Sequence, residues 1–578
     1  MTTPGPRAPS PTDPRDRWLR LGVALLAVLV SLTALRNQFP LDDKPIIVEN
    51  PFVTTPALWR GIFTASYWPA TYAADLYRPL TTLWLMLQRW AGSGRPEVHH
   101  AVSLLLYAVC AALTYTLCRR VAGVGAALVA ALLFAVHPVH VEAVAASVNQ
   151  AELVVGALGA VMVLLWLRVR ARGLPSPAAN AGLALLYLLA CGTKESGVML
   201  LGLVGAAELL LVDDGTPALR RLLATRRTWL LLLLVAVAFI AARATVLDDV
   251  VGTFTAETLR GQRLGGRALT MLGAMPVLAR LLAWPDDPKI DYSPTEIVRA
   301  DAFGGAQALG LVLVLGVAAT LAWSWRRRPA VAFGLAWFAI TYFPVSNVLI
   351  PTGIVLAERT LLAPTMGLAL ALGSGLDALG ARLQAGPRAL RFACAGTLAA
   401  LVTLGALETA RAHRAWYGTN TLFRDAVERG TRSYRVYWQF GLLLRDLGKY
   451  AEARALIQRA IAIHQDDPFP WMGLASAWER DDRCDAAIPV YDLILRRRPD
   501  MEEARAHLAS CLAWEARYDE ARRVARVGAA HGPNDELFAR MAQFADSAAR
   551  LGRPRHSVNL EALIAPHARA RYSTLYTR

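Results

Sequence analysis

The sequence has little charge and little cysteine for its length. Only 18% of its 578 residues are charged, 55% are apolar, and the mean hydropathy is +0.35. A soluble protein of several domains carries more charge, so the composition excludes that class and predicts a polytopic membrane protein. The formal charge of +16 does not indicate a nucleic-acid partner, because the basic residues lie in short clusters between apolar runs, as in cytoplasmic membrane-protein loops.

The cysteines predict neither a disulfide framework nor a metal site. They show no CxxC motif and no metal-ligand spacing, and four of the six lie in apolar segments, where a thiol packs as a small hydrophobic group. The six are Cys110, Cys118, Cys191, Cys394, Cys484 and Cys511.

Eleven apolar segments are candidates to span a membrane, for which roughly 20 residues are needed. The first has no small-residue cleavage site after it, so we interpret it as a retained signal anchor. The segments are 18–36, 98–118, 122–136, 152–168, 178–192, 197–212, 229–247, 304–324, 330–350, 360–378 and 390–408. Two further apolar helices, 78–91 and 265–284, are ambiguous, because the first is short and the second carries Arg267 and Arg280.

Clusters of arginine predict the orientation of this membrane domain, residues 18–410, because cytoplasmic loops are rich in Lys and Arg. If both ambiguous helices lie on or dip into the outer face, every arginine cluster between spans falls inside. Counting either helix alone as a span would invert everything after it. The clusters are Arg119/Arg120, Arg168/Arg170/Arg172, Arg220/Arg221/Arg226/Arg227, Arg326/Arg327/Arg328 and Arg382/Arg388/Arg391. This orientation predicts a disordered cytoplasmic segment at 1–17, a first outer loop at 37–97 and an outer C-terminus.

The sequence changes character from about Trp416 and becomes charged and periodic. Small residues recur every 34 positions, as do apolar ones, which predicts tetratricopeptide-type repeats over 416–535 and a helical or flexible tail over 536–578. The recurring sets are Ala453/Ala487/Ala521, Gly441/Ala475/Ala509 and Phe440/Leu474/Leu508. Five side chains at inward-facing positions are candidates to bind an extended segment, with structural packing as the alternative: Trp438, Arg445, Met472, Arg480 and Trp514. The predicted fold is all-α, a helical membrane bundle followed by an α-solenoid.

Seven acidic residues fall at outer helix ends or in outer loops in this topology. They are Asp42, Asp43, Asp75, Glu142, Glu152, Glu195 and Glu358. A single acid there is readily explained by solvation, but these acids come with polar partners in short clusters, which predicts one outward-facing site. The partners are Arg78, His137, His140, Lys194 and Arg359. A metal bound by His137, His140 and Glu142 is the weaker interpretation, because Pro138 breaks the helical register.

In the same order these clusters resemble the transmembrane and tetratricopeptide-repeat family of O-mannosyltransferases, within the GT-C glycosyltransferase superfamily. The similarity runs over most of 18–535. The matching motifs are the Asp42-Asp43 pair, "NP" at 50–51, "YRPL" at 77–80, "HPVHVEAVA" at 137–145, "AEL" at 151–153, "KESG" at 194–197, "DYS" at 291–293 and "AER" at 357–359. Two departures are "NQAEL", where the family leads us to expect Arg before "AEL", and "ERTLLAPT", which lacks the aromatic residues expected there.

The resemblance implies inverting transfer of a sugar, mannose or another hexose, from a polyprenyl phosphate to a protein or glycan on the outer face. Asp42 or Asp43 is then the base that accepts the acceptor's proton, and Arg78, Lys194 and Arg359 are the cations that bind the departing phosphate. Glu142 and Glu195 then orient these cations or the histidines. No cofactor or metal is expected beyond the lipid-linked donor. The Arg- and Ala-rich composition and short loops suggest a bacterial inner membrane with periplasmic repeats.

Two other functions remain open at this point. A ligase or polymerase of lipid-linked glycans predicts a large outer loop between late spans, whereas this chain has its acid pair early. A non-catalytic scaffold whose repeats recruit proteins predicts that neutralising Asp42 and Asp43 has no effect. A transporter is disfavoured, because no inverted repeat is evident.

Overall fold

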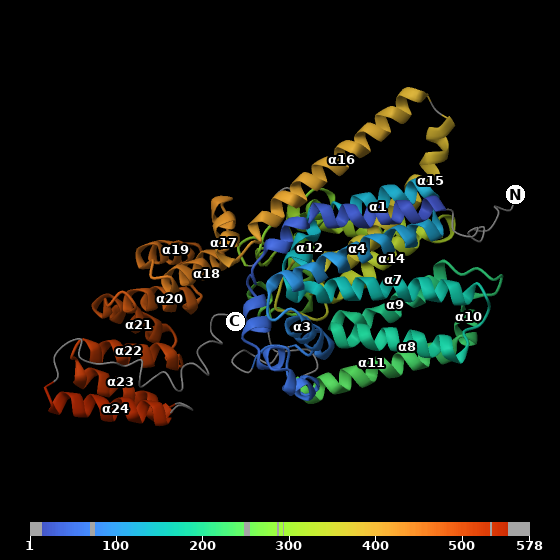
Figure 1. Cartoon of the computed structure of the whole chain (residues 1–578). Helices are drawn as coiled ribbons and strands as arrows, with labels where there is room; N and C mark the ends of the chain where they lie inside the picture. Colours follow the sequence, from blue (N-terminus) through green and yellow to red (C-terminus); the bar gives the residue numbers. More distant parts are fainter. Residues whose placement is uncertain are drawn as a thin grey trace. The chain divides into compact units, whose positions relative to one another are not determined.

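The computed structural model describes residues 14–69, 76–247, 255–285, 288–292, 294–385, 387–531 and 535–552. Throughout these residues the regular elements are helices and no strand occurs, which confirms the predicted all-α fold. The chain divides into two compact units with a boundary between Thr421 and Leu422. We call them the membrane unit and the repeat unit and describe each by itself (Figure 1).

The membrane unit is a bundle of long helices that lie side by side (Figure 1). Its helices are α1 (Pro14–Val30), α2 (Pro51–Thr54), α3 (Pro79–Ala91), α4 (Pro96–Val121), α5 (Val124–Ala135), α6 (Val141–Ala145), α7 (Gln150–Arg170), α8 (Pro177–Thr193), α9 (Leu200–Leu210), α10 (Ala218–Ala224), α11 (Arg226–Leu247), α12 (Leu264–Ala283), α13 (Gly305–Arg327), α14 (Pro329–Tyr342), α15 (Leu362–Ala385) and α16 (Arg388–Ala415). Close packing of small residues joins helices in lipid. A Cβ at Gly334 of α14 would lie 2.6 Å from the Gly367 carbonyl oxygen of α15, so both positions require glycine.

Seven helices of the described chain are long and apolar enough to cross a membrane, or eight crossings if the bent pair 124–135 and 138–145 is one span. Six of the seven coincide with predicted spans and the seventh is α12. The other predicted spans form shorter helices, namely α1, α5, α8, α9 and α14. The predicted count of about eleven is therefore not confirmed. The candidate spans nevertheless indicate an integral membrane protein.

Helix α12 is long and apolar enough to cross a membrane, yet both of its ends contact loops at one end of the bundle. Near its start, Arg267 donates a hydrogen bond from Nε to the Val348 carbonyl (3.2 Å). Near its end, the Leu282 carbonyl is hydrogen-bonded to Nε2 of His137 (3.1 Å). Val139, two residues after His137, and Val348 belong to one apolar cluster that also includes residues of α12. A helix held in this way lies across the end of the bundle, which favours the predicted placement on one face of the membrane.

The two ends of the bundle differ in charge. Along α7, Glu152 lies in the first turn and Arg170 in the last, about 27 Å away at 1.5 Å per residue. At the arginine end, the carboxylate of Glu208 is fully buried and accepts hydrogen bonds from Arg170 Nε and Trp166 Nε1, both at 3.0 Å. Arg221 pairs with the same carboxylate at 3.5 Å. The predicted site residues therefore gather at the opposite end from the arginine clusters.

The repeat unit is a series of antiparallel helix pairs, as the 34-residue period predicts. Its helices are α18 (Tyr434–Asp446), α19 (Tyr450–Ile463), α20 (Pro468–Glu479), α21 (Cys484–Arg497), α22 (Glu502–Trp514), α23 (Tyr518–His531) and α24 (Asp535–Arg550), and α17 (Thr419–Glu428) leads into it. The periodic alanines are buried, and a Cβ at Gly441 would lie 3.0 Å from the Ala453 carbonyl oxygen. Small residues therefore occupy the predicted helix crossings. Part of the predicted tail is helix α24, and part of the predicted N-terminal segment belongs to α1.

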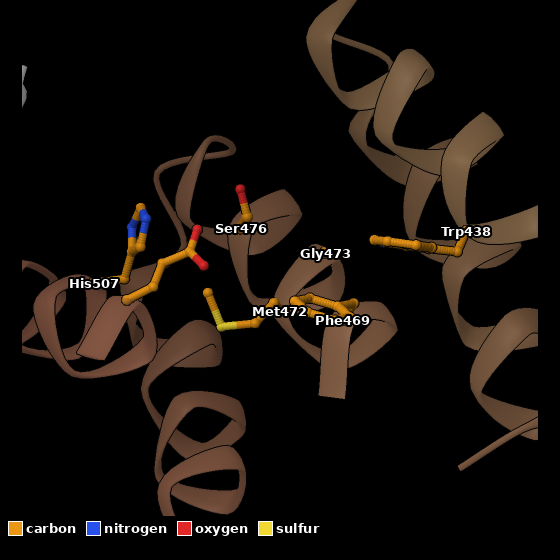
Figure 2. A pocket seen from close by; sticks show the side chains of 7 residues that line it. Trp438, Phe469, Met472, Gly473, Ser476 and His507 are labelled. Carbon is orange, nitrogen blue, oxygen red and sulfur yellow. The ribbon is translucent and has the colours of Figure 1, made fainter. Parts of the chain in front are cut away.

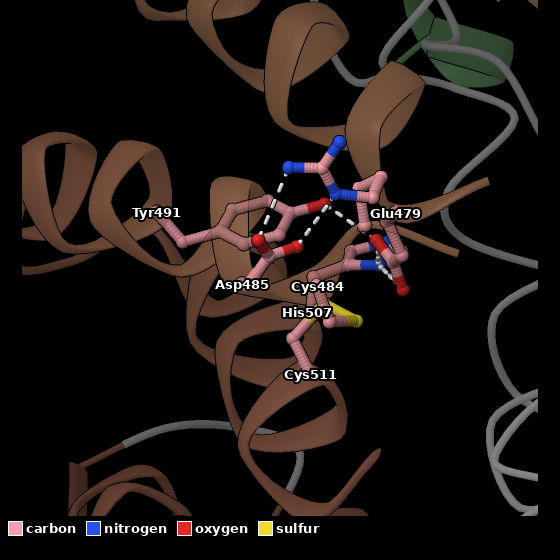
Figure 3. Close-up of a disulfide and its surroundings, with 7 residues drawn as sticks. Glu479, Cys484, Asp485, Tyr491, His507 and Cys511 are labelled. Carbon is pink, nitrogen blue, oxygen red and sulfur yellow. Dashed lines mark hydrogen bonds and ion pairs between the residues drawn. A yellow bond between two sulfur atoms is a disulfide. The ribbon is translucent and has the colours of Figure 1, made fainter. Parts of the chain in front are cut away.

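A disulfide joins Cys484 of α21 to Cys511 of α22 (Figure 3). Their Cα atoms are 5.1 Å apart, within the usual range, although 27 residues separate them in sequence. The expectation of no disulfide was therefore wrong for this pair. It failed because packing between neighbouring repeats, and not a cysteine motif, brings the two residues together.

Candidate functional site

Two neighbouring carboxylates lie in a tight turn that follows α1 and the short helix η1 (Leu32–Arg36). The N–H of Asp43 donates to the Pro40 carbonyl (3.0 Å), which closes the turn. Leu41 lies at its corner with a φ of +46°, a left-handed conformation that residues other than glycine rarely adopt. The turn separates the two acids, because Asp42 is exposed whereas Asp43 is fully buried.

The buried Asp43 joins the first loop to the segment before α7. Its carboxylate accepts hydrogen bonds from the N–H groups of Ser147 (2.9 Å) and Val148 (2.8 Å). Burial raises the pKa of Asp43 to about 7, although these hydrogen bonds act to lower it. Of the two predicted catalytic carboxylates, only Asp42 is open to solvent.

Arg78, immediately before α3, forms a bidentate pair with Glu195 in the short helix η6 (Glu195–Met199). Arg78 Nε lies 2.9 Å from Oε2 and Nη2 lies 2.7 Å from Oε1. Burial acts to raise the pKa of Glu195, but the charge and hydrogen bonds of Arg78 outweigh it and lower the pKa to about 2. The guanidinium also lies 5.2 Å from the ring centroid of Tyr67.

Two more ion pairs lie beside this one. Lys194 pairs with Glu152 in the first turn of α7, and both side chains are about nine-tenths buried. Arg359, in the short helix η9 (Glu358–Leu361), pairs with Glu142 through its guanidinium and also donates its backbone N–H to Glu142 Oε2 (2.9 Å). The charges of Asp42 and Glu152 act on Arg359 as well. The three pairs therefore lie within electrostatic reach of one another and of the turn at residues 40–43, which we call the acid turn.

The predicted metal trio is dispersed among separate partners. His137 hydrogen-bonds the Leu282 carbonyl, Glu142 pairs with Arg359, and His140 lies between the hydroxyls of Tyr107 (3.0 Å) and Thr365 (2.7 Å). Within the described ranges no group of three His, Cys, Asp or Glu residues is placed to hold a metal ion.

Glu358 is 3% exposed and accepts hydrogen bonds from the Tyr292 hydroxyl and from the Lys289 N–H (2.8 Å). It therefore holds Tyr292 of the "DYS" motif against η9. Asp75 lies outside the described residues. All the other predicted site residues occur at this one end of the bundle.

Sequence reasoning missed several residues that shape this end. Asn50 donates from Nδ2 to the Tyr67 carbonyl (3.3 Å) and accepts the Phe52 N–H (3.0 Å), which holds Tyr67 beside Arg78. Gln150, at the position where Arg was expected, is fully buried and bridges α3 and α4 through Gln88 and the His99 carbonyl. Asn50 and Tyr292 lie in the motifs "NP" and "DYS", so a signal was present for both. Tyr67 is one of the aromatic residues of the amphipathic stretch 50–68, which predicts a place at the membrane interface and not a contact with Arg78.

Chemically, this end of the bundle combines the exposed Asp42 carboxylate with three ion-paired cations, Arg78, Lys194 and Arg359. A guanidinium has five N–H donors, and Glu195 engages only two of those of Arg78, so the pairing leaves donors for an anion. Bidentate contacts of this kind suit phosphate oxygens. The carboxylate partners hold the cations in place before a ligand binds.

The repeat unit has a separate small pocket lined by three successive first helices of the repeats (Figure 2). Its lining residues are Trp438, Phe469, Met472, Gly473, Ser476, Glu503 and His507. Its volume is about 20 Å³, room for one or two water-sized groups and too little for a sugar ring. Trp438 is 2% exposed and its Nε1–H has no hydrogen-bond partner in the described chain.

Charged side chains border the apolar wall of this pocket. Burial raises the pKa of Glu503 to about 7. Burial acts to lower the pKa of His507, but its pairing with Glu479 (2.9 Å) outweighs this and raises it to about 9. Of the five predicted inward-facing residues, only Trp438 and Met472 line this pocket; Arg445 donates to Ser476 (2.9 Å), and Arg480 and Trp514 lie elsewhere.

The repeat unit matches known families of repeat proteins. Family models described as "Tetratricopeptide repeat" match residues 420–468 and 439–502, and a second such model matches 480–543. The chain is therefore a membrane protein with tetratricopeptide repeats.

Over most of its length the chain is also similar to proteins named as protein O-mannosyl-transferases. Mouse protein O-mannosyl-transferase TMTC3 is 23% identical over 501 residues, which cover 82% of this chain and 54% of the mouse protein. Human TMTC1 is 26% identical (73% and 52%), and F38B6.6 of Caenorhabditis elegans is 24% identical (79% and 65%). The resemblance drawn from the motifs is thereby confirmed. The chain spans about half the length of the mouse and human relatives it matches.

Proposed function

We propose that this chain is a membrane glycosyltransferase that moves a sugar, mannose or another hexose, from a polyprenyl phosphate to a hydroxyl of a protein acceptor. The observation that carries the proposal is the exposed Asp42 at the same end of the bundle as the ion-paired Arg78, Lys194 and Arg359. The printed names of the relatives support mannose and a protein acceptor.

In the proposed reaction, the acceptor oxygen attacks the anomeric carbon of the sugar and its proton passes to Asp42. The bond from that carbon to the phosphate oxygen breaks with inversion, and its electron pair leaves with the lipid phosphate. A phosphate is already a good leaving group, so no general acid of the glycosidase kind is needed. Arg78 and Arg359 stabilise the negative charge that develops on the phosphate. Asp43, which is buried, positions the turn and takes no proton from the acceptor.

We place this site and the repeat unit on the non-cytoplasmic face of the membrane. The arginine clusters lie at the opposite end of the bundle from the site residues, and such clusters belong in the cytoplasm. The Cys484–Cys511 disulfide supports the same side for the repeats, because disulfides persist in oxidising compartments. The relatives are animal proteins and give no support to the predicted bacterial inner membrane.

The repeat pocket suits a short neutral side chain of an extended acceptor. Its wall offers the apolar side chains of Phe469 and Met472, and its polar groups include the unpartnered Trp438 N–H and the Ser476 hydroxyl. A serine or threonine side chain matches both the size and the chemistry. We therefore propose that the repeats bind the protein acceptor.

The test is a transfer assay with the purified full chain in detergent. Labelled mannosyl and glucosyl polyprenyl phosphates are compared with the corresponding nucleotide sugars as donors, with a serine- and threonine-rich peptide as acceptor. The proposal predicts incorporation from a lipid-linked donor only. Incorporation from the nucleotide sugar alone would contradict it.

A further inference from the structure

The corner of the acid turn is strained and is held from a distant part of the chain. Leu41, with its φ of +46°, donates its backbone N–H to Thr419 Oγ1 (3.0 Å), across 378 residues of sequence. A left-handed conformation is sterically unfavourable for a residue other than glycine, so it persists only where the surroundings enforce it. The Thr419 bond is one such constraint.

A second bond fixes the same loop to the same segment. The Gln38 N–H donates to the Tyr417 carbonyl (2.8 Å), two residues before Thr419. The Gln38 carbonyl in turn hydrogen-bonds Nε2 of His100 (3.0 Å). Residues 38–41 are thus attached to the stretch between α16 and α17.

The other side of the turn is fixed independently. Asp43 accepts the N–H groups of Ser147 and Val148, so the turn is held at Leu41 by one part of the chain and at Asp43 by another. Asp42 is the residue between these two attachments, and it is the exposed one. The direction in which the Asp42 side chain points therefore depends on the attachments at Leu41 and at Asp43.

We propose that Thr419 is a positioning residue that keeps the Leu41 turn in its strained form and so aims the Asp42 carboxylate at the acceptor. This inference rests on the proposed function, in which Asp42 is the base. Thr419 is also the first residue of α17, the helix that continues into the repeats. Thr419 lies within the membrane unit, so this hydrogen bond holds the turn from inside the same unit.

The test compares transfer kinetics of the full chain carrying Thr419→Val, which keeps the shape of the side chain and removes the acceptor oxygen. One intramolecular hydrogen bond corresponds to about a fivefold change in an equilibrium, so kcat is expected to fall about fivefold, with the KM for the lipid donor unchanged. The matched control is Thr397→Val on the exposed face of α16, whose hydroxyl bonds only within its own helix to Ala393 (3.0 Å). The control is expected to retain wild-type kcat.

Rescue separates positioning from a merely structural role. Glycine adopts a positive φ without strain, so Leu41→Gly is expected to restore kcat in the Thr419→Val background to within about twofold of wild type. If Thr419 served only stability, the added flexibility of glycine would lower activity further. If valine prevents folding, Thr419→Ser, which keeps the oxygen, is expected to show wild-type kcat, and a fivefold loss in that variant would overturn the inference.

Asp42→Asn is measured in parallel to separate the inference from the proposed function. Full transfer by Asp42→Asn contradicts the proposed function. Loss in Asp42→Asn together with wild-type kcat in Thr419→Val contradicts the positioning role of Thr419 alone.

Discussion

Asp42 and Asp43 are neighbours in sequence, yet the structure predicts different consequences for their asparagine variants. Asp43 is fully buried and accepts two backbone hydrogen bonds at 2.9 and 2.8 Å. An amide in its place offers one acceptor and turns its NH₂ group toward the other N–H. Leaving one of these two buried N–H groups without an acceptor costs about 1–3 kcal/mol, so Asp43→Asn is expected to destabilise the membrane unit by that amount. Asp42→Asn, at an exposed position, is expected to change stability by less than about 0.5 kcal/mol and to abolish transfer.

Thermal unfolding in detergent and single-turnover transfer measure the two effects on the same preparations. Asp301→Asn, at an exposed carboxylate paired with Arg299, is the control and is expected to change neither. Because burial raises the pKa of Asp43 to about 7, wild-type activity is expected to fall as the pH drops through 7 and this carboxylate loses its charge. The Asp43→Asn variant is expected to lack that step. Equal destabilisation by Asp42→Asn and Asp43→Asn would refute the division of roles.

Three further predictions concern other parts of the molecule. Arg78→Lys keeps the charge but loses the bidentate guanidinium contact with Glu195. The KM for the lipid donor is therefore expected to rise about tenfold in transfer kinetics, and an unchanged KM would exclude a phosphate contact. Cys484→Ala removes the cross-link across a 27-residue loop, and loop-closure entropy predicts a loss of about 3.5 kcal/mol in the stability of the repeat unit. Limited proteolysis should therefore cut the repeat unit faster than in wild type, and equal rates would argue against the disulfide. Glu479 raises the pKa of His507 from its ordinary 6.5 to about 9. The stability that this pair contributes is therefore fully present below pH 6.5 and is lost as the pH rises through 9. Glu479→Gln should flatten the pH dependence of the free energy of unfolding over that range, and an unaltered profile would refute the pairing.

The sequence alone predicted the elements whose signals are local. Apolar run length predicted the membrane helices, and the 34-residue period predicted which small residues, such as Gly441 and Ala453, lie at helix crossings. The number of spans is not confirmed, because several predicted spans form helices shorter than the seven long apolar ones, and α12 is one of those seven although both of its ends are held at one end of the bundle.

Contacts between distant residues could not be predicted in the same way. Asp43 is bonded to backbone groups more than 100 positions away in the sequence. The left-handed conformation of Leu41 depends on a hydrogen bond to Thr419, which is more distant still. The Cys484–Cys511 bond arises from packing of neighbouring repeats. Which charged residues would gather was predictable from the order of the motifs, whereas which carboxylate would pair with which cation required the fold.

We propose above all that the exposed carboxylate of Asp42, on the non-cytoplasmic face, catalyses sugar transfer from a lipid phosphate. The most direct measurement uses sealed vesicles of the two opposite orientations, containing the full chain and a labelled mannosyl polyprenyl phosphate, with a membrane-impermeant serine- and threonine-rich peptide outside. We predict that label enters the peptide only where the cytoplasmic face is enclosed, and that Asp42→Asn abolishes the incorporation. Incorporation from the cytoplasmic face, or undiminished incorporation by Asp42→Asn, would contradict the account.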